Sequence, residues 1–188
     1  MVTGTTGMNG RGDRSRDTLR ILWGYCPPEI RTALRPILVD YLWLVPSWCQ
    51  SLYVRWDGKP EDQDSNATSS AQPEYRQAQL YIHPGWLAEI HATRVHNVIH
   101  ELVHVSVAPM VVEHEDLAKR LLDDAPQFRG YAQEQWRRSF EGAVQDIATA
   151  IGQLPGPFPS VAFDEVDDDD AAPPAANERE KPKPLKET

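Results

Sequence analysis

The stretch that decides the fold of this chain runs from residue 95 to residue 107 and reads VHNVIHELVHVSV. Its apolar side chains recur at intervals of three and four residues, which is the spacing of an apolar stripe on a helix. We therefore predict a helix over residues 93–107 that ends before Pro109. His100 and His104 lie four positions apart, so this helix would place both imidazoles on one face, one turn apart.

The two histidines and the residue that follows the first of them have the chemistry of a metal site. Two imidazoles one turn apart can bind the same tetrahedral metal ion. Glu101 stands next to His100 and would act on a water molecule of the metal as a general base, without being a ligand. The alternative is that both histidines belong to the core and have ordinary hydrogen-bond partners. The apolar surroundings favour the metal site, because burying two histidines and a glutamate without a metal would be costly.

A catalytic zinc site usually has three protein ligands and one open position, so a third ligand is needed. The metzincin class would have a histidine at position 110, where this chain has Met110, and is thereby excluded. We predict Glu141, which borders the apolar stripe of a later helix. His114 and Glu134 remain alternatives. The competing interpretation of Glu141 is a surface carboxylate that pairs with one of the arginines one turn before it.

Three other histidines lie outside this ligand set. His96 precedes His100 by four residues, and a straight helix cannot bring a third imidazole around a tetrahedral ion. We expect His96 beside the site or on the surface. His83 and His91 are expected on the surface.

The composition fits one domain with two tails. The chain has 188 residues, of which 40% are hydrophobic, and a formal net charge of -9. We expect a single domain over residues 18–160. Residues 1–17 and the acidic, proline-rich residues 161–188 are expected to be disordered, because they have little apolar surface to bury.

The distribution of charges and the two cysteines indicate which binding partners and which cellular compartment to expect. Lys and Arg do not cluster in a way that predicts a nucleic-acid surface. The longest apolar run, over residues 37–48, is interrupted by Asp40 and Pro46 and is too short to cross a bilayer. The N-terminal residues have no apolar core of a secretory signal, and Cys26 and Cys49 are expected to be free thiols. We expect a cytoplasmic protein that binds neither nucleic acid nor membrane.

The remaining pattern predicts an α+β fold with a short antiparallel sheet packed on the helix that carries the histidines. Residues 51–56 and 75–82 are rich in strand-forming residues and are expected to pair as a hairpin, joined by a mobile loop over residues 59–73. A further short strand or turn is expected over residues 18–24. The other expected helices cover residues 30–45, 111–122 and 133–151.

Two strands, a His-Glu-x-x-His helix and a later helix with a glutamate resemble the gluzincin metallopeptidases. The run from Val98 to His104 is similar to that of the small single-domain metallopeptidases of phage and prophage genes, the minigluzincin type. The resemblance implies a zincin-like domain with zinc bound by His100, His104 and Glu141, and with Glu101 as general base. It also implies that residues 75–82 form the edge strand that aligns a peptide substrate by backbone hydrogen bonds.

The chain departs from the gluzincin pattern at three points. The interval from His104 to Glu141 is much longer than the thermolysin-like spacing between the motif and the glutamate. Four residues after Glu141 the chain has Gln145, with Asp146 following, where the family has an acidic residue. No residue clearly supplies a contact to the oxyanion of the transition state. Tyr131 is our first choice for that contact, and the alternatives are Arg137 and Arg138.

These observations predict a zinc-dependent metallopeptidase whose partner is a peptide or protein substrate. Two other functions remain open. One is a regulatory protease restricted to a single cognate protein. The other is a binding module without catalysis, in which the metal ion only holds the two helices together.

Overall fold

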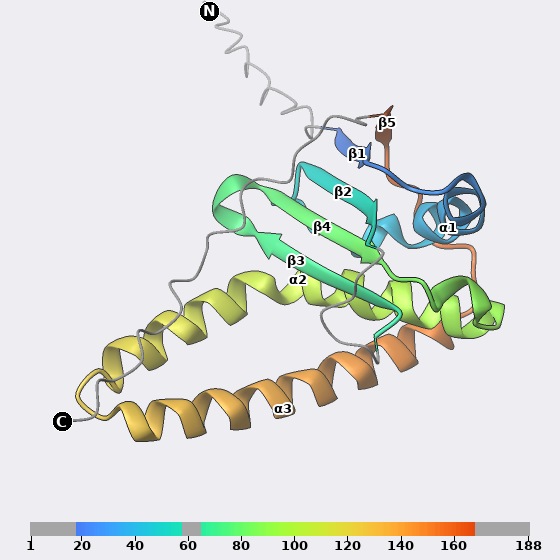
Figure 1. The fold of residues 1–188 in the computed structure, drawn as a ribbon. Helices are drawn as coiled ribbons and strands as arrows, with labels where there is room; N and C mark the ends of the chain where they lie inside the picture. Colours follow the sequence, from blue (N-terminus) through green and yellow to red (C-terminus); the bar gives the residue numbers. More distant parts are fainter. Residues whose placement is uncertain (1–17, 58–64, 168–188) are drawn as a thin grey trace, which may run out of the picture.

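The computed structural model describes residues 18–57 and 65–167, which form an α+β fold, as predicted. A five-stranded mixed sheet packs against helices, and its strand order is β3-β4-β2-β1-β5 (Figure 1). The strands are β1 (Leu19–Trp23), β2 (Ser51–Trp56), β3 (Ala67–Gln72), β4 (Gln77–Ile82) and β5 (Phe163–Asp167). The helices are α1 (Pro28–Tyr41), α2 (His91–Leu121) and α3 (Pro126–Gly152).

The predicted antiparallel hairpin of residues 51–56 and 75–82 is wrong, because β2 and β4 pair in parallel. Leu52 faces Ala78 and Val54 faces Leu80 in this register. The reason is the strand β3 between them in the sequence, which pairs antiparallel with β4. The chain reverses once before β3 and again before β4, so β4 runs in the same direction as β2.

Strand β3 lies at the edge of the sheet that the sequence had assigned to residues 75–82. It falls within residues 59–73, which were expected to form a mobile loop. Within β3 the side chains are small or polar, and of its six residues Ala67 alone is buried. An edge strand of this kind gives no hydrophobic alternation that the sequence pattern could reveal. Residues 59–64 of the expected loop lie outside the described part of the chain.

Strand β5 lies within residues 161–188, which were expected to be disordered. It pairs in parallel with β1 at the other edge of the sheet. Ion pairs fix it to α1, because Arg35 lies 2.8 Å from Glu165 and Arg31 contacts Asp167. Acidic residues therefore belong to an ordered strand here. The predicted tails over residues 1–17 and 168–188 lie outside the described residues.

One face of the sheet and two helices share the main hydrophobic core. Leu52 and Val54 of β2 and Leu80 of β4 are fully buried in it. Helix α1 contributes four buried residues, and η1 (Leu42–Leu44) continues it to the end of the predicted helix over residues 30–45. The predicted strand near residues 18–24 is confirmed as β1, and both cysteines are free thiols.

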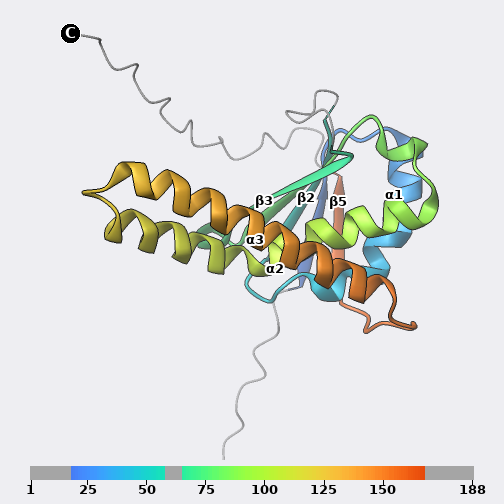
Figure 2. The same cartoon turned by 90° about the horizontal axis from the view of Figure 1, so that it is seen from below.

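Helices α2 and α3 are longer than predicted and lie side by side (Figures 1 and 2). The sequence predicted two helices over residues 93–107 and 111–122, but α2 continues through Pro109. A proline inside a helix removes one backbone hydrogen bond, and packing against α3 explains how the helix tolerates this loss. Helix α3 begins at Pro126, where a turn was expected; proline is well accommodated at the first helical position.

The two long helices extend past the sheet as a helical hairpin (Figure 2). Near the sheet they enclose a second small core of Ile99 and Val103 from α2 with Val144 and Ala148 from α3. Ile147 has the helical spacing of the apolar stripe that the sequence predicts for the helix over residues 133–151, but it is 44% exposed. This second core fixes the face of α3 that meets α2.

Helix α2 is also long and apolar enough, by length and composition, to cross a membrane. The central helix of a soluble domain has the same properties. In this chain Val98 and Leu102 of α2 are buried in the main core with the sheet, which accounts for its apolar character.

Candidate metal centre

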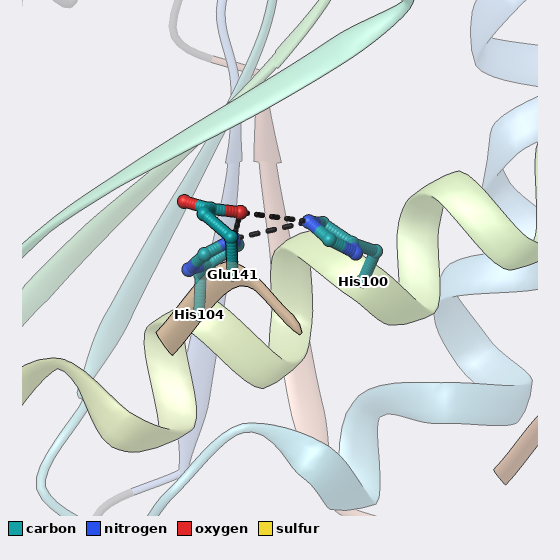
Figure 3. A group of neighbouring side chains, drawn as sticks. All are labelled: His100, His104 and Glu141. Atoms are coloured by element: carbon teal, nitrogen blue, oxygen red, sulfur yellow. Dashed lines mark hydrogen bonds and ion pairs between the residues drawn. The ribbon is translucent and has the colours of Figure 1, made fainter. Parts of the chain in front are cut away.

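Three side chains from two helices point toward one another beneath the edge of the sheet (Figure 3). Helix α2 provides His100 and His104, one turn apart, and α3 provides Glu141. The two Nε2 atoms lie 3.0 Å apart. Oε2 of Glu141 lies 3.3 Å from Nε2 of His104 and 3.7 Å from Nε2 of His100. The second core holds the two helices so that these three side chains meet. Val103, which precedes His104, and Val144, which lies one turn after Glu141, are both buried in it.

The spacing of these three atoms fits a tetrahedral metal ion. Zinc ligands lie roughly 2.0–2.2 Å from the ion, so two ligand atoms of a tetrahedron are roughly 3.3–3.6 Å apart. The three observed distances fall within a few tenths of an ångström of that range. Two imidazole nitrogens and one carboxylate oxygen are also a donor set that zinc accepts, and three protein ligands leave one position open.

The electrostatics of the two histidines favour the form that binds a metal. Burial lowers the pKa of His100 below its ordinary value of 6.5, and the neighbouring His104 adds to this effect. Burial likewise lowers the pKa of His104, although the Glu141 carboxylate acts in the opposite direction. A lowered pKa favours the neutral imidazole, and only a neutral imidazole has a lone pair to give to a metal.

Glu101 lies beside this group and contacts the edge strand. Its Oε2 accepts a hydrogen bond of 2.7 Å from the hydroxyl of Ser69 on β3. Burial raises the pKa of Glu101 to about 7, the Ser69 hydrogen bond opposes this rise, and the charge of Glu141 adds to it. A carboxylate with a pKa near 7 can both take up and release a proton at neutral pH, as a general base and acid must.

The four side chains open onto a cleft of about 1020 Å³ between β3, α2 and α3. The residues of β3 from Thr68 to Ala71 form one wall. The helical hairpin forms the other, with Trp136 and Phe140 as its aromatic part. The volume of the cleft is at the upper end of the range for small-molecule sites, and a strand at the edge of the sheet lines it.

The structure does not bring the other predicted ligands and contacts into the group. The ring of His114 stacks on Trp136 at 3.9 Å between centroids. Glu134 pairs with Arg137 and Arg138 on the surface of α3. Tyr131 is 67% exposed and lies ten residues before Glu141, which is roughly 15 Å along a helix. Of the three residues considered for the oxyanion contact, Arg137 lines the cleft, whereas Tyr131 and Arg138 do not.

The remaining histidines divide into one beside the site, one on the surface and one in the core. The ring of His96 lies 6.4 Å from that of His100 and is in hydrogen-bond contact with Gln145 of α3. His91 is exposed, as predicted. His83 was expected on the surface, but it is 3% exposed. Its Nε2 lies 2.9 Å from the hydroxyl of Thr68, so the buried imidazole has a polar partner. The sequence pattern gives no sign that these two residues meet.

Ser69 is the contact that sequence reasoning missed. It falls in the stretch that was expected to be a loop, and its neighbours are small and polar. The only available signal was the run of threonine, serine and alanine over residues 67–71, which is compatible with an edge strand but does not require one.

Comparison of this chain with family models, curated proteins and solved structures gives no match. The gluzincin resemblance thus rests on the residues of the chain alone.

Proposed function

We propose that this protein is a zinc-dependent hydrolase of peptide bonds. The observation that carries the proposal is the joint placement of His100, His104 and Glu141 at tetrahedral spacing, with a second carboxylate, that of Glu101, beside them. A bound zinc ion would supply Lewis acidity, which polarises a carbonyl group and makes a water molecule more acidic.

Glu101 performs the proton transfers in this proposal. Its carboxylate takes a proton from the attacking water and afterwards delivers it to the leaving amine. Ser69 keeps the carboxylate in one orientation through the hydrogen bond to Oε2. The pKa of about 7 matches this double role, since the group changes its protonation state readily at neutral pH.

The substrate class follows from the cleft. Strand β3 is at the edge of the sheet and lines the cleft next to Glu101. An edge strand has unpaired backbone groups that can add a further strand. An extended peptide that pairs with β3 would pass directly over the three proposed ligands, which supports a peptide or protein substrate.

The binding module without catalysis would require a closed metal site. A structural zinc site usually has four protein ligands. Among the described residues the group has three members, and His114, the alternative ligand, stacks on Trp136 instead. The open position favours the hydrolase over the module.

The experiment is a comparison of Glu101→Gln with the wild-type chain, both loaded with zinc. Hydrolysis of blocked peptides or of a protein mixture should fall by about 100- to 10,000-fold, while the zinc content stays at the wild-type level. Glu113→Gln is the matched control, because Glu113 lies exposed on the same helix and does not line the cleft. Retention of full activity in Glu101→Gln would refute the role of this residue.

A further inference from the structure

A second, smaller hollow lies next to the large cleft. Its volume is about 250 Å³, which is below the size of a typical small-molecule site and suits a single side chain. It shares Ser65, His100 and Glu101 with the large cleft. The two hollows therefore meet at the proposed base, and a peptide in the large cleft would reach the small one directly after Glu101.

The lining of the small hollow consists mainly of uncharged polar side chains. Asn97 lies one turn before Glu101 on α2, and Thr93 lies one turn before Asn97. Asn66 lies at the start of β3, and Gln145 comes from α3. Among the described residues, the titratable side chains that line it are Glu101, His100 and His96. Hydroxyl and amide groups offer both donors and acceptors, so a polar side chain in the hollow can form hydrogen bonds with them, whereas an apolar side chain cannot.

The direction of β3 assigns the small hollow to one side of the scissile bond. Ser65 and Asn66 precede β3 and line the small hollow, whereas Ser70 and Ala71, at the other end of the strand, line the large cleft. Antiparallel pairing is slightly more stable per residue than parallel pairing. A peptide antiparallel to β3 therefore begins beside Ala71 and ends beside Asn66. Its residues after the scissile bond then lie at the small hollow.

We propose that the small hollow binds the side chain of the residue directly C-terminal to the scissile bond, and that it selects an uncharged polar side chain: Asn, Gln, Ser or Thr. This inference rests on the proposed peptidase function. Asn97 is the specificity-determining residue, because it faces the hollow from the helix turn before Glu101 and is not one of the proposed ligands. The large cleft, which includes Trp136 and Phe140, has a different lining, so the two sides of the bond are selected independently.

The experiment is the digestion of a library of blocked peptides by the full-length, zinc-loaded protein, with the cleaved bonds identified by mass spectrometry. The wild-type chain should cleave before Asn, Gln, Ser or Thr more often than before Leu or Met. Asn97→Leu should change the ratio of kcat/KM for Asn over Leu at that position by about tenfold or more. Preferences on the N-terminal side of the bond should stay as in the wild type. Gln135→Leu is the matched control, since Gln135 is exposed on α3 and lines neither hollow.

Two outcomes would overturn the assignment of the hollow: a wild-type preference for apolar or charged residues after the bond, or an Asn97→Leu variant with an unchanged preference. Absence of any cleavage by the zinc-loaded wild type would contradict the proposed function instead. In that case binding of two blocked peptides, one with Asn and one with Leu at the tested position, is measured with the zinc-loaded Glu101→Gln chain. Preference for the Asn peptide that Asn97→Leu abolishes supports the hollow as a polar side-chain site, and equal binding of both peptides refutes it.

Discussion

The hydroxyl of Ser69 donates a hydrogen bond of 2.7 Å to Oε2 of Glu101, across 32 positions of sequence. The same hydroxyl lies 3.2 Å from the backbone carbonyl oxygen of Glu101. The edge strand of the sheet is thereby connected to the proposed general base. Any shift of β3, such as that produced by a bound peptide, would act on the carboxylate that transfers the proton.

Substitution of Ser69 by alanine should move the acidic limb of the pH profile of kcat/KM to higher pH. The hydrogen bond stabilises the ionised form of Glu101 and lowers its pKa, so its loss raises that pKa further. The base must be ionised to act, and activity at pH 6 should therefore fall by a larger factor than activity at pH 9. Ser139→Ala is the control, because Ser139 is exposed on α3 and does not line the cleft. An unshifted profile in Ser69→Ala would contradict the role of this hydrogen bond.

Substitution of Glu101 by glutamine should stabilise the metal-free protein at high pH. The pKa of Glu101 is about 7 in the folded chain, against an ordinary value of 4.5. Between pH 4.5 and pH 7, Glu101 is ionised in the unfolded chain but still protonated in the folded chain. The free energy of unfolding therefore falls as the pH rises through this range. At pH 8 Glu101→Gln should thus be more stable by up to about 3 kcal/mol. At pH 4.5 the difference should largely disappear. Urea unfolding with a chelator present measures both, and equal stabilities at pH 8 would count against a buried, high-pKa carboxyl.

The zinc affinity should begin to fall at a lower pH than it would at a site whose histidines have the ordinary pKa of 6.5. Protons compete with zinc for the imidazoles, and burial lowers the pKa of both His100 and His104 below 6.5. Competition with a chelator of known affinity measures the dissociation constant at each pH. A marked loss of affinity between pH 8 and pH 7 would show that these histidines titrate in the ordinary range or higher.

Substitution of Pro109 by alanine should stabilise the protein. Helix α2 continues through Pro109, where the ring removes the hydrogen bond to the carbonyl oxygen of Val105. Alanine restores that bond and should raise the free energy of unfolding by about 1–3 kcal/mol. Met110→Ala, at the exposed next position, should change stability by less than about 0.5 kcal/mol. A Pro109→Ala variant that is no more stable than the wild type would argue against a continuous helix.

The metal group was the most predictable part of the molecule, because its chemistry depends on helix geometry. Residues four apart on a helix share a face, so the proximity of His100 and His104 follows from the sequence. The placement of Glu141 follows less directly. It required the stripe of α3 to face α2, and Val144 and Ala148 fulfil that requirement in the second core.

The sheet was much less predictable, because its two edge strands have little apolar surface. The side chains of β3 are small, and β5 is acidic. Strand β3 is recognisable only by its pairing with β4, the next strand along the chain, and β5 depends on arginines of α1 that are distant in sequence. The position of Ser69 depends on β3 and could not be predicted before that strand was known.

The most direct measurement of the central claim is the zinc content of the purified full-length protein after zinc loading and dialysis. One zinc per chain is predicted for the wild type and for Glu134→Ala, which changes an acidic residue outside the group. His104→Ala and Glu141→Ala each remove one of the three proposed ligands and should lose zinc under the same dialysis. A wild-type chain that retains no zinc, or a His104→Ala variant that retains a full equivalent, would contradict the account.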